Sequence, residues 1–158
     1  MKERSVLEMD STAPTPKLSV ELVPRSQWAF NLRSELRPRD WDRIRKATYA
    51  AAGHRCELCG GVGRKHPVEA HERWEYNDEL HIQKLVGVEA LCPQCHRTKH
   101  FGLAVQMGLG SMCKAHMMRV NRWTSAQADA HLTHAFEVWR RRSAVSWTLD
   151  LTWLKGVR

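Results

Sequence analysis

Hydrophobic residues recur three and four positions apart in three parts of the chain, the spacing that places them on one face of a helix. This pattern predicts helices over residues 40–52, 111–121 and about 125–142. Asp40 is a candidate N-cap for the first helix, and Thr124 begins a capping-box pattern for the last. Helices are therefore expected on both sides of the central part of the chain.

Strand patterns lie in the centre and near the end of the chain. Residues 68–72 read as a short β segment, and the apolar stretch 85–88 is a candidate second strand. Apolar and polar residues alternate over 147–153, the period of a half-buried strand. Loops are expected around Gly102, Gly108 and Gly110, because glycine commonly interrupts regular structure. The mixture predicts an α+β fold.

The first part of the chain has a different composition. Residues 1–24 mix charged residues with Ser, Thr and three prolines, which predicts a flexible arm with a short extended piece at 18–23. Residues 25–158 fit a single domain. No stretch has the length and apolarity of a signal peptide or a membrane span, so a cytoplasmic protein without a membrane partner is expected.

Charge favours a polyanionic partner. The formal net charge is +8, and Lys and Arg near phosphates release condensed counterions on binding. Nucleic acid is therefore the expected partner, although a basic solvated surface without a partner explains charge alone equally well. Basic residues that could contact phosphates lie near the central motifs or on flanking helices: Arg43, Arg45, Lys46, Arg73, Arg97, Lys99 and Arg140–Arg142.

Four of the five cysteines form two C-x-x-C pairs, Cys56/Cys59 and Cys92/Cys95. Two such knuckles bring four thiolates to one tetrahedral ion and leave no position for water, which predicts a structural Zn²⁺ site. Cys113 is expected to be a core thiol. The adjacent His96 could instead replace a cysteine in a Cys3His site.

Histidines around the second knuckle predict another metal site. His96 and His100 are four positions apart, so on a helix both imidazoles project from one face, with Lys99 at its edge. His71, on the preceding strand, would complete a site with three imidazoles. Three protein ligands leave an open position, as in catalytic metal centres.

The order C-x-x-C, a strand bearing His71, then L-C-x-x-C-H-x-x-K-H resembles the HNH endonuclease family, specifically bacterial and phage members with a supporting zinc site. The resemblance covers about residues 55–102 and implies a ββα-metal (His-Me finger) core. The preceding helix, and the helices and strand of the C-terminal extension 103–158, would be additions. It also implies a nuclease that hydrolyses phosphodiesters, with DNA as substrate and Mg²⁺, Mn²⁺, Zn²⁺ or a similar cation at the active site.

The sequence departs from this family at two positions. Where many members have a histidine as general base, Glu72 follows His71, so the carboxylate is the expected base if His71 binds the metal. Alternatively His71 is the base and Glu69 supplies a hard oxygen ligand. Gly87 occupies the position of the family's structural Asn, and Asn77 lies elsewhere in the loop.

The expected function is therefore a metal-dependent endonuclease. Catalysis would depend on His71, His96, His100, on Glu72, and on Lys99 or Arg97 to steady the phosphate. A catalytically inactive, zinc-stabilised module that binds nucleic acid or protein on the same scaffold is the alternative, motivated by Glu72 and Gly87. A purely structural zinc protein is a third possibility.

Overall fold

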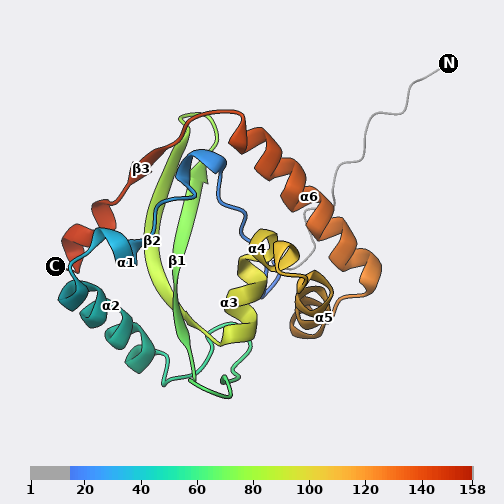
Figure 1. Cartoon of the computed structure of the whole chain (residues 1–158), viewed down its shortest axis with the longest axis horizontal. Helices are drawn as coiled ribbons and strands as arrows, with labels where there is room; N and C mark the ends of the chain where they lie inside the picture. The colour runs from blue at the N-terminus through green and yellow to red at the C-terminus, as the bar shows by residue number, and fades with distance from the viewer. Residues whose placement is uncertain (1–14, 158) are drawn as a thin grey trace.

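The computed structural model describes residues 15–157, which form an α+β fold around one small sheet (Figure 1). The sheet has the order β1-β2-β3, with β1 (Glu69–Asn77) antiparallel to β2 (Ile82–Leu91) and β3 (Thr148–Asp150) parallel to β2. On one side of the sheet lie α1 (Leu32–Glu35), α2 (Pro38–Ala51) and the 3-10 helix η2 (Thr152–Gly156). On the other side lie α3 (Pro93–Lys99), α4 (Phe101–Gln106), α5 (Gly110–Asn121) and α6 (Ser125–Ser143). A further 3-10 helix, η1 (Arg25–Gln27), precedes α1.

Each side of the sheet has its own hydrophobic core. On the α2 side, Ile44 of α2 packs with Leu85 of β2 and with Leu154 of η2. On the other side, Leu91 of β2 packs with Met117 of α5 and with other apolar side chains of α3 to α6. Burial of apolar surface on both faces holds the hairpin of β1 and β2 as the central layer of the domain.

Several predicted elements are confirmed. The capping box at Thr124 is present, with Gln127 as its partner, and the predicted helices over 111–121 and 125–142 correspond closely to α5 and α6. The first helix begins at Pro38 rather than at Asp40, because proline suits the first helical turn. Asp40 is therefore not the N-cap, and its carboxylate pairs with Arg37 instead.

Other elements differ from the prediction. The strands β1 and β2 extend well beyond 68–72 and 85–88, because cross-strand pairing continues along polar residues whose pattern carries no clear signal. The C-terminal strand is shorter than 147–153 and passes into η2. The loop expected at Gly102 is part of α4, where tertiary packing of Phe101 and Ala104 outweighs the low helix propensity of glycine.

Residues 15–24 form an extended strap, which agrees with the short extended piece predicted at 18–23; residues 1–14 of the predicted arm lie outside the described part of the chain. The backbone of Leu18 exchanges hydrogen bonds with the side-chain amide of Asn121 on α5. The backbone N–H of Val20 donates to His131 on α6, and that of Glu21 donates to the carbonyl of Lys99 on α3. The strap thus joins three helices and places the side chain of Glu21 beside the sheet.

None of the helices within residues 15–157 combines the length and the apolar character that crossing a membrane requires.

Candidate metal centre

The four paired cysteines form one cluster. Their sulfur atoms all lie within 4.8 Å of one another, which is a spacing that can hold a structural metal ion such as zinc. The cluster joins the loop after α2 to the start of α3, where Cys92 also caps the helix. Three of the four cysteines are buried, so an ion there would be shielded from water and from exchange.

The thiol chemistry of this cluster suits a metal ion. The hydrogen bond from the Cys95 thiol lowers the pKa of Cys56 to about 4, and the same interaction raises the pKa of Cys95. Four thiols this close cannot all ionise without a compensating cation, so metal binding would release protons. His116 of α5 lies 3.1 Å from the Cys95 sulfur and contacts the cluster from outside. The sequence analysis did not single out this contact.

Three histidines form a second, separate cluster. The ligand nitrogens of His71, His96 and His100 also lie within 4.8 Å of one another. His71 projects from β1, His96 from α3, and His100 from the C-cap of α3, with 3.2 Å between the Nε2 atoms of His96 and His100. His96 thus lies with the histidines and not among the cysteines, which contain a complete set of four sulfur ligands without it.

Two of these imidazoles are hydrogen-bonded to carboxylates. Glu21 of the strap lies 2.7 Å from Nε2 of His71, and Glu69 contacts Nδ1 of His96. His71 is only 2% exposed, and its Nδ1 atom is buried without a hydrogen-bond partner among the described residues. A histidine that binds a metal through one nitrogen commonly bonds a carboxylate through the other. The free nitrogen of His71 and the spacing of the cluster therefore fit a divalent cation.

Burial favours the neutral form of the histidines, which is the form that binds a metal ion. It lowers the pKa of His100 to about 4, an effect that nearby His71 and His96 reinforce. Burial also lowers the pKa of His96, although the hydrogen bond to Glu69 opposes this shift. Both imidazoles are consequently neutral near pH 7 and retain a lone pair for a metal.

Glu72 lies in the same cavity as His71 and His100. One of its carboxylate oxygens accepts a hydrogen bond from the backbone N–H of Leu32, at 3.0 Å, and so binds the first turn of α1. The other oxygen is the one that could act on a water molecule. Glu69, the alternative oxygen ligand, instead bridges His96 and His66.

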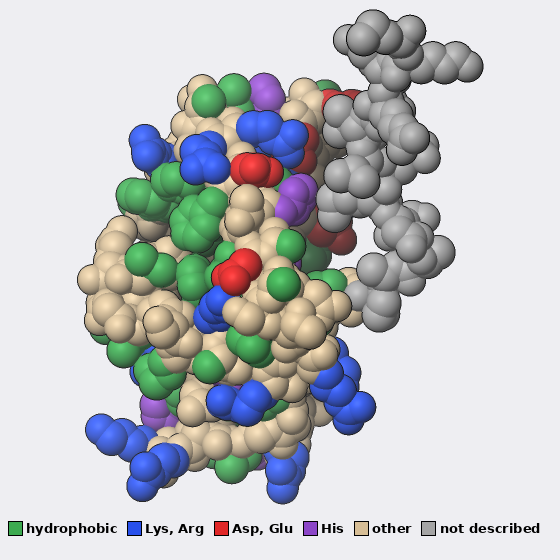
Figure 2. Space-filling model, turned by 90° about the vertical axis from the view of Figure 1, so that its right-hand side faces the viewer, with side chains coloured by type: hydrophobic (Ala, Val, Ile, Leu, Met, Phe, Trp, Pro, Cys, Tyr) green, Lys and Arg blue, Asp and Glu red, His purple; other side chains and the backbone are tan. Residues whose placement is uncertain are grey.

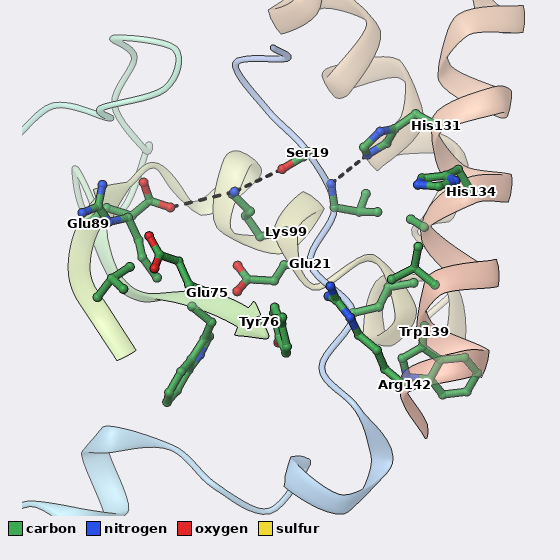
Figure 3. A pocket seen from close by; sticks show the side chains of 17 residues that line it. Ser19, Glu21, Glu75, Tyr76, Glu89, Lys99, His131, His134, Trp139 and Arg142 are labelled. Atoms are coloured by element: carbon green, nitrogen blue, oxygen red, sulfur yellow. Dashed lines mark hydrogen bonds and ion pairs between the residues drawn. The ribbon is translucent and has the colours of Figure 1, made fainter. Parts of the chain in front are cut away.

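Lys99 points into a different cavity, shown in Figure 3. Its ammonium group lies 4.0 Å from the carboxylate of Glu89 and 3.5 Å from the hydroxyl of Ser19. Glu89 is paired with His71 across the sheet, and burial raises its pKa. The structure thus places Lys99 against an acidic group of β2, in a cavity that Glu72 does not line.

The remaining predicted residues are spread over the surface. Arg73 and Arg97 are exposed, and Arg73 lies against Gly87, where a side chain on that glycine would meet its guanidinium at 3.1 Å. Arg43 donates to the carbonyl of Val157, and Lys46 lies 3.8 Å from Asp42 on the α2 side of the sheet. Those two side chains are therefore not grouped with the histidines.

Asn77 braces the turn between β1 and β2. Its side-chain oxygen accepts hydrogen bonds from the backbone N–H groups of Glu79 and Leu80. This is a local role at the far end of the hairpin from His71, and Gly87 does not share it.

Sequence reasoning missed Glu21. It lies in the short extended piece predicted at 18–23, fifty positions before His71, and no local pattern links the two. Only the alternation of apolar residues at Leu18, Val20 and Leu22 hinted that this segment packs against the domain.

No family model, no curated protein and no solved structure matches the chain. The interpretation of the two clusters therefore depends on their geometry and chemistry.

Proposed function

We propose that this protein is a metal-dependent endonuclease of the HNH type that hydrolyses phosphodiester bonds of nucleic acid. The observation that carries the proposal is the convergence of His71, His96 and His100, from a strand and the helix that follows its hairpin, beside a separate four-cysteine cluster. The order β1, β2, α3 is that of the ββα-metal core implied by the resemblance.

The geometry favours one division of roles. Glu21 occupies Nε2 of His71, so the remaining nitrogen is better placed to bind a cation than to accept a proton from water. Glu72 is then the candidate general base, through the oxygen that does not bind Leu32. When bound, the cation would polarise a phosphate oxygen and neutralise charge on the leaving 3′ oxygen.

The charge of the protein supports a nucleic-acid substrate. The chain carries eight more positive than negative formal charges. Figure 2 shows Lys and Arg side chains at the upper and lower ends of the face that carries α5 and α6, with few acidic side chains between them. Arg73 and Arg97 are exposed and available to phosphates. DNA is the substrate that the resemblance favours.

The test is cleavage of supercoiled plasmid in Mg²⁺ or Mn²⁺. The wild-type protein should nick the plasmid, and His71→Ala and His96→Ala should each reduce the rate by about 100-fold or more, because each removes a metal ligand. His134→Ala is the matched control, since His134 is an exposed histidine outside the cluster, and it should leave the rate unchanged. Uncut plasmid and uncut single-stranded circular DNA with the wild type under every metal would refute the endonuclease. Salt-sensitive DNA binding without cleavage would then favour the inactive nucleic-acid-binding module.

A further inference from the structure

The histidine cluster opens into a groove of unusual character for a protein that acts on a phosphate backbone. The groove has a volume of about 630 Å³, and its lining includes His71, His100 and Glu72. The rest of its wall is largely aromatic or aliphatic: Trp28, Phe30, Trp74, Leu103, Phe136 and Trp139. No Lys or Arg side chain is among the described residues that line it. The groove therefore offers apolar and aromatic surface beside the cation site, but no positive charge for a row of phosphates.

One indole in this groove is both exposed and held in place. Trp28 is 59% exposed, and its ring lies nearly parallel to that of Trp139, with an interplanar angle of 13° and 6.0 Å between the ring centroids. Both indole N–H groups donate to the same carbonyl oxygen, that of Val23 in the strap. The guanidinium of Arg25 lies 4.9 Å from the centre of the Trp139 ring and adds a cation–π contact. The exposed face of Trp28 is thus a preformed flat surface.

Helix α4 adds further exposed apolar side chains to the groove. Leu103 and Val105 of α4 both line the groove and are 58% and 50% exposed. His100, at the end of α3, lines the same groove. A ligand that reaches the histidines through this groove would therefore be in contact with apolar side chains of α4 as well as with the indoles.

We propose that this groove takes an unpaired nucleobase next to the phosphate that is cut, so that the substrate is single-stranded nucleic acid or a strand that is locally unpaired. The inference rests on the proposed function and deepens it. A nucleobase is flat and apolar on its faces, and stacking on an exposed indole stabilises it whatever its identity. In a duplex the bases are already stacked and paired, and a base can enter such a pocket only by leaving the stack.

Charge separates the two parts of the site. Glu21 and Glu72 line the groove and would repel phosphates in it, whereas a cation on the three histidines would attract one phosphate at its end. A nucleotide would satisfy both the groove and the cation site if its phosphate bound the cation and the neighbouring base stacked on Trp28. An apolar peptide would satisfy the walls but would leave the cation site without a ligand.

The test is binding of labelled oligonucleotides by fluorescence anisotropy, in Ca²⁺ instead of Mg²⁺ or Mn²⁺. Three probes are compared: a single strand, the same strand in a duplex, and a single strand of abasic residues with the same phosphates. The single strand should bind at least about 10-fold more tightly than either of the others, since stacking contributes to each bound base.

Variants locate the effect. Trp28→Ala should weaken binding of the base-bearing single strand by roughly 5- to 150-fold, with little effect on the abasic strand, and Trp28→Phe should retain most of the affinity. Leu80→Ala is the matched control, because Leu80 is a 67% exposed apolar residue on the β1–β2 turn. Thermal unfolding of each variant would show that the fold is retained.

The outcomes distinguish this inference from the proposed function. Equal affinity for single strand and duplex, or a Trp28→Ala effect that is the same on the abasic strand, would overturn the groove as a base site. So would a wild-type dimer that Trp28→Ala converts to a monomer, because the groove would then be covered by a second copy. If the protein cleaved plasmid but gave any of these results, the proposed nuclease function would be retained and the base site in the groove would be rejected. The expected binding pattern, without cleavage of plasmid or of single-stranded DNA in any metal, would support the groove as a base site and refute the nuclease.

Discussion

The contact between Glu21 and His71 leads to a prediction about metal affinity. Replacing Glu21 by Gln removes the negative charge behind the His71 imidazole but preserves the size of the side chain. Hydrogen bonds to charged groups are roughly twice as strong as neutral ones, so the imidazole would be held less firmly and would be a poorer ligand. The affinity of the three-histidine cluster for a divalent cation should therefore fall.

The structure indicates the size of the effect. Loss of the group that orients a metal-bound histidine typically costs about 10- to 100-fold in metal affinity, which corresponds to about 1.4–2.7 kcal/mol. His71 is only 2% exposed, so water has little access to replace the lost carboxylate. Glutamine keeps a neutral acceptor, so Glu21→Gln should lie near about 10-fold, and Glu21→Ala nearer about 100-fold.

The measurement is a Co²⁺ titration, followed by visible absorption, of protein loaded with one equivalent of zinc for the cysteine cluster. Bands of cobalt bound to nitrogen ligands report the histidine cluster, whereas intense thiolate charge-transfer bands would reveal exchange into the cysteine cluster. Glu75→Gln is the matched control, because Glu75 is an exposed carboxylate of the cavity in Figure 3 and its removal changes the net charge equally. An affinity for Co²⁺ unchanged by Glu21→Gln, or lowered as much by Glu75→Gln, would refute the orienting role.

Three further predictions concern stability. Thr124→Ala removes the capping box of α6 and should lower the free energy of unfolding by about 1 kcal/mol in urea titrations; no change would mean that packing alone sets this helix end. Cys92→Ala should abolish the cooperative thermal transition, as should a chelator strong enough to remove the structural ion, because metal binding contributes to folding free energy; a transition unaltered by either would contradict a metal in this cluster. Burial raises the pKa of Glu89, so its stabilising contribution is complete while it is protonated and is lost as the pH rises through its folded pKa. The Tm of Glu89→Gln minus that of wild type should therefore increase from about pH 4 to about pH 7, and a constant difference would show that this carboxyl is not penalised by burial.

The sequence alone was sufficient for the features that depend on local spacing. The two C-x-x-C pairs predict a four-cysteine cluster, and the structure brings those four sulfurs together. The four-residue interval between His96 and His100 places two imidazoles on one side of α3, since that interval is close to one helical turn. The capping box of α6 likewise involves residues only three positions apart.

The tertiary structure decided which groups surround the histidines. Glu21 reaches His71 from a segment fifty positions earlier, and the turn of Glu72 toward Leu32 depends on α1, a helix that no periodic pattern predicted. Lys99 lies beside His100 in sequence, yet its ammonium group lies near Glu89 in a different cavity. Contacts of this kind join residues whose separation carries no periodic signal, so they follow from how the strap, the sheet and the helices pack against one another.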